Sequence, residues 1–365
     1  IAYCRENNID VLVLDHHEIP EQIPNANVIM HPFMSNFNEN STSGASTAFF
    51  FSIYMLKRFD KYLSTLASIS IISDMMPLKG YNRDLLRIVF PRYIEGEFYQ
   101  IDLLKGDDTY DENSIGMSIA PKINSVGRII EDDSINDIVK YFVSNDNGSI
   151  LTYYNWINDL NNERKEASKF SMENQLDIDK NDAAIVLKVE EKEGLIGLIA
   201  NSMINKYKKP SIIFTYNKEQ DVLKGSARSL EGFNVVESFN ELKDLMVAFG
   251  GHASAGGCSI KVKDFEEFKK RFNKFAEKNP IVEEEKPSIP LSITEISFEN
   301  YDLIQSFGPF GEGWKKPLFN VENIRVGSLK FSKDLKHIIT QIGTNAKITG
   351  FNISKDFSMP TAPSK

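Results

Sequence analysis

The feature that most constrains this chain is the sequence VLVLDHHEIP at residues 11–20, where an aliphatic run ends in three consecutive polar residues. A continuous aliphatic run such as residues 11–14 is typical of a strand buried on both faces in a parallel sheet. In open α/β sheets, side chains just beyond the carboxyl ends of strands face the ligand crevice. Asp15, His16 and His17 occupy that position, so the sequence predicts a functional site there. Polar residues that merely end a strand are the alternative.

Apolar spacing predicts mainly helices over the following part of the chain. Residues 44–73 predict one or two buried helices, which end in a loop indicated by Pro77, Gly80 and Asn82. Residues 151–179 contain no Gly or Pro and place apolar residues at helical intervals, which predicts a long helix linking two domains. The other predictions here are a helix at 134–143 and a boundary at 145–149 that closes the first domain.

Strand and helix patterns alternate from residue 183 to residue 276, which predicts a compact α/β domain. The predicted strands are 183–188, 210–216, a segment running into 225–229, and 258–262; the predicted helices are 196–207, one ending at Met246, and 265–276, with a glycine-rich loop at 250–257. The acidic, proline-containing residues 281–290 predict a linker. Beyond it, a short helix, the motif GPFGEG and β-like segments at 323–329 and 337–343 predict a small β-barrel, cut short by the end of the chain.

Composition restricts the environment and the partners of the chain. No apolar run approaches the roughly 18 residues that a membrane span needs, and no secretory signal pattern is present. The two cysteines, Cys4 and Cys258, form no CxxC pair, which favours a reducing, cytoplasmic location. The net charge of −9 weakly disfavours nucleic acid as a partner without excluding it, because a cleft can stay basic on an acidic protein.

A metal site is the first chemical prediction. A mixed imidazole and carboxylate set suits Mn²⁺, Mg²⁺ or Zn²⁺ rather than an ion that prefers thiolates. Asp74 follows the apolar run ASISIIS and is the candidate for a further carboxylate ligand. A helix cap is the alternative role for Asp74.

Phosphate binding is the second chemical prediction. Gly250 and Gly251 precede His252 in AFGGHASAGG, where successive backbone N–H groups could form an anion-binding nest. In KGSARS, Arg228 offers a planar fork suited to phosphate and Ser226 a hydroxyl donor.

Arg128 follows a glycine turn in PKINSVGR and could reach a phosphodiester. Read singly, each of these features fits a tight turn or a solvated surface. Together with the metal ligands they indicate metal-assisted hydrolysis of a phosphate ester.

These motifs occur in the order seen in the RecJ family of single-strand-DNA-specific 5′→3′ exonucleases, which belongs to the DHH phosphoesterases. LDHH, SDMMPLKGYNR, PKINSVGR, GLIGLIANSMINKYKKPSIIF, KGSARS, FGGHASAGG and GPFGEG carry the resemblance over nearly all 365 residues. DHH and GGHxxAGG alone would indicate only the superfamily, whereas GSARS, GPFG and LNNERK at 160–165 make RecJ the specific match. The resemblance implies a DHH phosphoesterase domain at 1–150, a connecting helix at 151–180, a DHHA1 substrate-binding domain at 181–280 and an incomplete OB-fold-like nucleic-acid-binding domain at 281–365.

The resemblance also implies roles for individual residues. His16 and Asp74 resemble metal ligands of a two-metal Mn²⁺ or Mg²⁺ site, Asp15 would orient His16 or lie close to the metals, and His17 would face the scissile phosphate. The residues similar to those that hold the nucleotide and its 5′ phosphate are Ser226, Arg228, Gly250, Gly251 and His252, with Arg128 similar to a further one. Aromatic residues of the OB-like domain could stack on bases, although core packing is expected for at least two of Phe307, Phe310 and Trp314.

The implied protein is a cytoplasmic, monomeric exonuclease of recombination and repair that acts on single-stranded DNA with a 5′ phosphate, with a single-strand-binding protein or a helicase as possible partners. Only fourteen residues precede Asp15, which leaves no place for the upstream family motifs that complete the metal site. We therefore expect an incomplete chain whose remaining ligands lie upstream of residue 1, and which alone binds metal poorly and is inactive. The alternatives are an oligoribonucleotide or cyclic-dinucleotide phosphodiesterase, which the third domain disfavours, and an inactive replication scaffold, which the surviving motifs disfavour.

Overall fold

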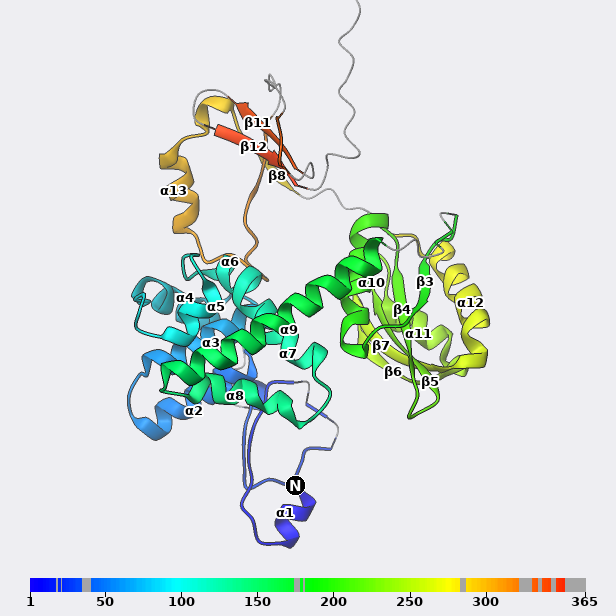
Figure 1. Cartoon of the computed structure of the whole chain (residues 1–365), viewed down its shortest axis with the longest axis horizontal. Coiled ribbons are helices and arrows are strands. Elements are labelled where there is room, and N and C mark those ends of the chain that lie inside the picture. The colour runs from blue at the N-terminus through cyan, green and yellow to red at the C-terminus, as the bar shows by residue number, and fades with distance from the viewer. Residues whose placement is uncertain are drawn as a thin grey trace, which may run out of the picture. The chain divides into compact units, whose positions relative to one another are not determined.

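The computed structural model describes residues 1–17, 19–20, 22–34, 41–173, 178–179, 181–282, 287–321, 330–333, 337–342 and 346–351. The chain divides into two compact units (Figure 1). Unit 1 comprises Ile1–Met76 and Ile88–Glu285, and unit 2 comprises Pro77–Arg87 and Lys286–Lys365. Helices and strands are mixed as the sequence predicts. None of the described helices is both long and apolar enough to cross a membrane.

The aliphatic run of the opening motif forms the short strand β1 (Leu12–Leu14), which pairs in parallel with β2 (Val28–Met30). The predicted parallel pairing is therefore confirmed. The predicted burial on both faces is wrong, because 42% of Leu12 and 55% of Val28 are exposed. Among the described residues only these two strands form the sheet, so its apolar side chains lack the cover that a wider sheet provides.

Helices follow as the apolar pattern predicts. Residues 44–73 form α2 (Gly44–Leu56) and α3 (Lys61–Ser73). The predicted loop is shorter than expected, because α4 (Gly80–Val89) already begins at Gly80, and the Asn82 side chain donates a hydrogen bond to the Pro77 carbonyl at 3.0 Å. The other elements of this part are α1 (Ala2–Glu6), η1 (Pro32–Met34), η2 (Phe90–Arg92), α5 (Tyr99–Lys105), α6 (Glu112–Ser114), the π-helical η3 (Ile115–Ile119), α7 (Ala120–Ile129), η4 (Asp133–Asn136) and α8 (Asp137–Val143).

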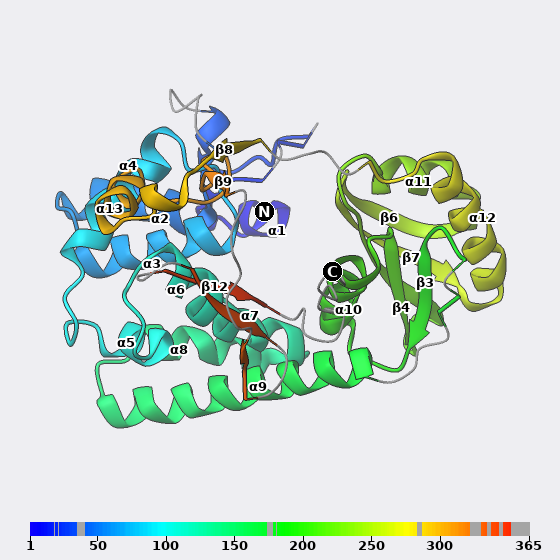
Figure 2. The same ribbon diagram turned by 90° about the horizontal axis from the view of Figure 1, so that it is seen from above.

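The predicted connecting helix is α9 (Asn147–Glu173), which Figure 2 shows as one continuous helix. It begins four residues before the predicted start. The Asp146 side chain explains the early start, because its Oδ2 accepts a hydrogen bond from the Ser149 backbone N–H at 2.7 Å and satisfies a free donor of the first turn. The predicted boundary at 145–149 therefore contains the first turn of α9.

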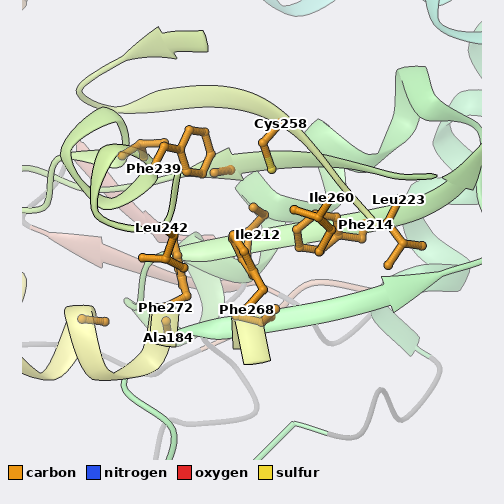
Figure 3. Packing of buried hydrophobic residues seen from close by; sticks show 14 of the residues in the cluster. Ala184, Ile212, Phe214, Leu223, Phe239, Leu242, Cys258, Ile260, Phe268 and Phe272 are labelled. Carbon is orange, nitrogen blue, oxygen red and sulfur yellow. The ribbon is translucent and has the colours of Figure 1, made fainter. Parts of the chain in front are cut away.

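The α/β part of unit 1 is a five-stranded sheet with the order β3-β4-β5-β7-β6. Its elements are β3 (Ile185–Val189), α10 (Glu193–Tyr207), β4 (Ser211–Asn217), β5 (Val222–Arg228), α11 (Val235–Glu241), η5 (Lys243–Leu245), β6 (Met246–His252), β7 (Ala255–Lys261), η6 (Val262–Asp264) and α12 (Phe265–Lys278). Helix α10 covers one face of the sheet and α11 and α12 cover the other. Figure 3 shows the core of the second face, where Phe239, Phe268 and Phe272 pack against strand residues such as Ile212 and Phe214.

The predicted glycine-rich loop at 250–257 is wrong, because these residues form the β-hairpin of β6 and β7, and the helix predicted up to Met246 ends at Glu241. Glycines are needed here for close packing. A Cβ on Gly256 would lie 2.8 Å from Cε2 of Phe239, and a Cβ on Gly251 would lie 2.4 Å from the Ala255 carbonyl oxygen. Gly251 also has φ +142°, which side chains of L-residues rarely adopt.

Unit 2 contains two small sheets. Strands β8 (Ser288–Pro290) and β9 (Leu318–Asn320) pair in parallel, and β10 (Lys330–Phe331), β11 (Ile338–Ile342) and β12 (Ala346–Gly350) pair antiparallel, with η7 (Ile293–Glu295) and α13 (Phe298–Ser306) between β8 and β9. The strand predicted at 337–343 is confirmed as β11. The strand predicted at 323–329 lies outside the described residues.

Residues 77–87 belong to unit 2 because they bind the turn that contains GPFGEG. The Leu78 N–H donates to the Glu312 carbonyl at 2.7 Å, and the Arg83 guanidinium lies 4.3 Å from the centre of the Trp314 ring. Of the three aromatic residues considered for stacking, Phe310 is buried, whereas 54% of Phe307 and 42% of Trp314 are exposed. The expectation that at least two of them pack in the core is wrong, since the Trp314 ring packs against Arg83.

Candidate metal and phosphate sites

The parallel pairing of β1 and β2 brings the residues that follow both strands to one edge of the sheet. Asp15, His16 and His17 follow β1, and His31 follows β2. The rings of His16 and His17 have their centres 4.5 Å apart. A group held by one imidazole is therefore within reach of the other.

Asp74 completes a pair with His16, since its Oδ2 lies 3.6 Å from Nε2 of His16. It is the C-cap residue of α3, where its backbone N–H donates to the Ser70 carbonyl at 3.0 Å, so the alternative role as a helix cap is also met. A carboxylate near the negative end of a helix dipole is unfavourable for stability. A cation bound nearby would compensate this unfavourable charge.

The geometry of this pair fits a shared divalent cation. Two donor atoms that each lie about 2.1 Å from one ion are about 3.0 to 3.4 Å apart at octahedral or tetrahedral angles. The observed 3.6 Å needs only a small adjustment. The start of α2 lies against the His16 ring, because a Cβ on Gly44 would be in van der Waals contact with Cδ2 of His16 at 3.4 Å. Within the part of the chain that the structure describes, no third histidine, cysteine or carboxylate joins the pair as a metal cluster.

The Asp15 carboxylate holds His17 rather than the ring of His16. Its Oδ1 lies 2.7 Å from Nδ1 of His17 and accepts the backbone N–H groups of both His16 and His17. Asp15 was expected to orient His16 or to lie close to the metals; it contacts His16 at the backbone N–H and not at the ring, and the second role stays a prediction. The hydrogen bond fixes Nδ1 of His17 as the protonated nitrogen facing Asp15 and leaves its Nε2 edge available to a substrate.

The pKa values of this pair move in opposite directions. The hydrogen bond from the His17 side chain, followed by that from the His16 backbone, lowers the pKa of Asp15 to about 2. The same hydrogen bond, with the charge of Asp15 and a smaller effect of Asp74, raises the pKa of His17. Both changes favour an ionised pair, in which His17 can donate a proton or stabilise negative charge.

His31 is a site residue that was missed from the sequence. It is 5% exposed, its Nδ1 accepts the Phe33 backbone N–H at 3.2 Å, and its Nε2 lies 2.8 Å from the His17 carbonyl oxygen. Since Nδ1 accepts, the proton must lie on Nε2, which donates to His17. His31 therefore holds the backbone of the DHH motif. The rule applied to β1, a polar residue directly after an apolar strand, would have found it after Val28–Met30.

A second cluster lies where α7, α10 and β5 meet. Nη1 of Arg128 donates to the Gly194 carbonyl at 3.1 Å, and Nη1 of Arg228 lies 3.0 Å from Oγ of Ser226. Burial lowers the pKa of both arginines, and the charge of Arg128 lowers that of Arg228 further. Two guanidinium groups that repel each other in a half-buried place favour a bound anion.

Glycines on the first turns of α10 make room for this cluster. A Cβ on Gly194 would lie 2.4 Å from the Arg128 carbonyl oxygen, and a Cβ on Gly197 would lie 2.9 Å from Nη2 of Arg228 and 3.1 Å from Oγ of Ser226. The motif GLIG thus brings a helix against both arginines. In the sequence, this motif stood out only through the family resemblance.

The hairpin of β6 and β7 adds the remaining predicted residues. Arg228 pairs with Ala255, which pairs with His252, so these residues form one row across three strands. Directly paired residues project from the same face of a sheet, with strands about 4.8 Å apart. Ser226 and Gly250 both pair with Gly257, so these three residues form a second row across the same strands, two residues away from the first. Small residues between Arg228 and His252 leave that face open for a ligand.

The predicted residues thus form two groups. The first consists of Asp15, His16, His17 and Asp74; the second consists of Arg128, Ser226 and Arg228, with Gly250, Gly251 and His252 on the adjoining hairpin.

Two family models match this chain, the DHHA1 domain at residues 181–278 and the RecJ OB domain at residues 288–364. The single-stranded-DNA-specific exonuclease RecJ of Bacillus subtilis (strain 168) is 29% identical over 338 residues, which cover 88% of this chain and 42% of that protein. The same-named protein of Haemophilus influenzae is 26% identical over 362 residues, covering 88% and 62%. The chain spans about half the length of these curated relatives.

Solved structures share the fold. RecJ in complex with Mn²⁺ from Thermus thermophilus matches with a TM-score of 0.81 and 23% identity over 98% of this chain and 55% of that one. Exonuclease RecJ bound to manganese matches with a TM-score of 0.62 and 25% identity over 76% and 72% of the two chains. The predicted order of a DHH-type domain, a DHHA1 domain and an OB domain is confirmed by these likenesses and the two family models.

Proposed function

We propose that this chain is part of a metal-dependent exonuclease that hydrolyses phosphodiester bonds of single-stranded DNA from the 5′ end. The proposal starts from the membership of the chain among RecJ-type proteins of the DHH superfamily. The observation that carries the proposal is the 3.6 Å separation between His16 Nε2 and Asp74 Oδ2. These residues lie far apart in the sequence, yet they form a donor pair suited to Mn²⁺ or Mg²⁺. The proteins named RecJ that are solved with Mn²⁺ support this choice of metal.

The residues of the first group have distinct proposed roles. His16 and Asp74 hold a divalent cation, which, when bound, supplies a hydroxide nucleophile and neutralises charge on the phosphoryl oxygens. Asp15 holds His17 as an imidazolium through the 2.7 Å contact. His17 then stabilises the developing negative charge on the phosphate or protonates the leaving oxygen. His31 keeps the backbone of His17 in place.

The second group determines which end of the strand is bound. Arg128, Ser226 and Arg228 offer guanidinium and hydroxyl donors to a 5′-terminal phosphate, and His252 extends the same face of the sheet. A pocket that binds a terminal phosphate selects the end of a strand, which favours cleavage from the 5′ end.

The RecJ OB domain match at residues 288–364 supports a longer single-stranded substrate, since OB domains hold single strands by backbone charge and base stacking. Of the three aromatic residues considered for stacking, Phe307 is the most exposed, with 54% of its surface accessible, and is our candidate for stacking on a base. We also propose a cytoplasmic location, a monomeric state, a role in recombination and repair, and cooperation with a single-strand-binding protein or a helicase.

An exonuclease assay tests the proposal. The assay uses a protein of the relatives' length that contains this chain. It should shorten single-stranded DNA labelled at the 3′ end progressively from the 5′ end in millimolar Mn²⁺, while duplex DNA should resist, and EDTA or His16→Ala should abolish the cleavage. A gel-shift assay with 5′-phosphorylated DNA in EDTA reports binding separately. Cleavage by His16→Ala at the wild-type rate, or cleavage independent of metal, would contradict the metal assignment.

A further inference from the structure

The Trp314 ring, directly after the GPFGEG motif, is held in place by two contacts within unit 2. Its Nε1–H donates to the Phe307 carbonyl at 2.9 Å, and the Arg83 guanidinium lies over the ring, 4.3 Å from its centre. Arg83 is fixed in turn, since its Nη1 donates to the Pro309 carbonyl at 3.1 Å and its Nη2 to the Phe307 carbonyl. Trp314 nevertheless keeps 42% of its surface exposed. The turn therefore presents an indole ring that is both oriented and accessible.

Lysine side chains surround this ring. The Lys79 side chain passes beside Gly313, because a Cβ on Gly313 would lie 3.4 Å from Cε of Lys79. Lys315 and Lys316 directly follow Trp314, and all three lysines are exposed. The accessible indole thus has ammonium groups on both segments that form the turn and its support.

The charge of this region is opposite to that of the whole chain. Residues 77–87 and 307–317 together contain five Lys and Arg and two Asp and Glu, a net charge of +3 on a chain of −9. Burial lowers the pKa of Arg83 and the charge of Arg87, one turn later on α4, lowers it further. Among the described residues, no carboxylate forms an ion pair with any of these five cations. Their charge is therefore available to a polyanion.

We propose that this surface binds single-stranded DNA by stacking a base on Trp314 and by holding neighbouring phosphates with the lysines. The surface consists of Lys79, Arg83, Trp314, Lys315 and Lys316. An aromatic side chain among cations is the combination that holds single strands without sequence preference. The inference rests on the proposed function, in which the OB domain holds a longer strand. It adds that Lys79 and Arg83, which lie outside the matched residues 288–364, take part in holding it.

An acidic protein segment is the other polyanion that would suit these cations. The exposed indole favours DNA, because a nucleobase offers a flat π-surface for stacking and an aspartate or glutamate side chain does not.

The fluorescence of Trp314 tests the stacking directly. The full 365-residue chain contains two tryptophans, so Trp156→Phe leaves Trp314 as the sole indole. This variant is titrated in EDTA with an oligothymidylate of about 12 nucleotides that carries a 5′ hydroxyl. The single strand should quench the fluorescence, because a stacked base quenches an indole, and the same strand paired with its complement should quench it far less.

Substitution of lysines tests the phosphate contacts. Lys315→Gln combined with Lys316→Gln removes two positive charges from exposed positions. If each lysine contacts a phosphate, the slope of log Kd against log salt concentration should be smaller by about 1.4 in this double variant, since each contact to a single strand contributes about 0.7. Lys261→Gln combined with Lys263→Gln, two exposed lysines at the end of β7 and in η6, is the matched control and should keep the wild-type slope.

The outcomes separate this inference from the proposed function. No quenching of Trp314 by the single strand, or a wild-type salt slope after substitution of Lys315 and Lys316, would overturn the inference. Equal quenching by polyglutamate or by the duplex would show a general polyanion surface, which also contradicts it. Quenching by the single strand together with no metal-dependent cleavage by a protein of the relatives' length would refute only the proposed exonuclease activity.

Discussion

Gly197→Ala should separate stability from ligand binding. The new Cβ would lie 2.9 Å from Nη2 of Arg228 and 3.1 Å from Oγ of Ser226. Comfortable contacts of a carbon atom begin near about 3.5 Å, so the guanidinium must move by roughly half an ångström. That shift is comparable to the tolerance of a pre-organised binding site. Loss of one charge-assisted hydrogen bond costs about 1.5 to 3 kcal/mol, which corresponds to about 10- to 100-fold weaker binding of a 5′-phosphorylated strand.

The same substitution should not destabilise the fold. Gly197 lies within α10, where alanine is favoured over glycine by about 0.5 to 1 kcal/mol, and the atoms that must move belong to side-chain ends. We expect the free energy of unfolding to rise by between 0 and about 1 kcal/mol. Urea denaturation measures this change, and fluorescence anisotropy with 5′-phosphorylated and 5′-hydroxyl strands measures the binding.

Two other glycines are the controls. Gly116→Ala meets no atom within 4 Å and should leave binding unchanged. Gly194→Ala would place a Cβ 2.4 Å from the backbone oxygen of Arg128 and should destabilise the protein by about 1 to 3 kcal/mol. Unchanged affinity of Gly197→Ala for the 5′-phosphorylated strand, or a fall in its unfolding free energy as large as that of Gly194→Ala, would refute the reasoning.

Three further predictions concern the other contacts. His31→Leu should lower the free energy of unfolding by about 0.5 to 1.5 kcal/mol in urea titrations, because the hydrogen bond from His31 to the His17 carbonyl is lost; a change below about 0.3 kcal/mol would contradict the assigned tautomer. In metal-free protein, NMR should find the pKa of His17 above 6.5, and the Asp15→Asn variant should return this pKa to near 6.5. Because the pKa of His17 is raised in the folded state, its contact with Asp15 stabilises the fold below pH 6.5. This stabilisation is lost as the pH rises through the folded-state pKa. Trp314→Leu should speed amide hydrogen exchange in residues 77–87, since the ring no longer stacks on Arg83; unchanged exchange would mean that the stacking contributes nothing.

The sequence predicts much of the fold because hydrophobic periodicity is a local property. Helix α10 and strand β4 were predicted nearly at their observed bounds, since each must bury a defined face. The hairpin of β6 and β7 was missed because its glycines read as a loop. These glycines are required by tertiary packing, because Gly256 must leave space for Phe239 on α11. A contact between residues far apart in the sequence cannot be read from a local pattern.

The sequence predicted which residues form the candidate site better than it predicted the contacts between them. The polar residues after β1 and the aspartate after α3 were found by position, and the structure brings His16 and Asp74 together. The partner of Asp15 could not be assigned, since adjacent residues point in different directions and the choice between His16 and His17 depends on side-chain rotamers.

The central claim is that His16 and Asp74 bind one divalent cation together. Mn²⁺ binding, followed by the electron paramagnetic resonance signal of the free ion, tests it in wild type, His16→Ala, Asp74→Asn and the double variant. If both residues bind one ion, each single substitution should weaken Mn²⁺ binding by at least about tenfold, and the double substitution should weaken it by much less than the product of the two. Equal affinity in all four proteins, or fully independent losses, would contradict the account.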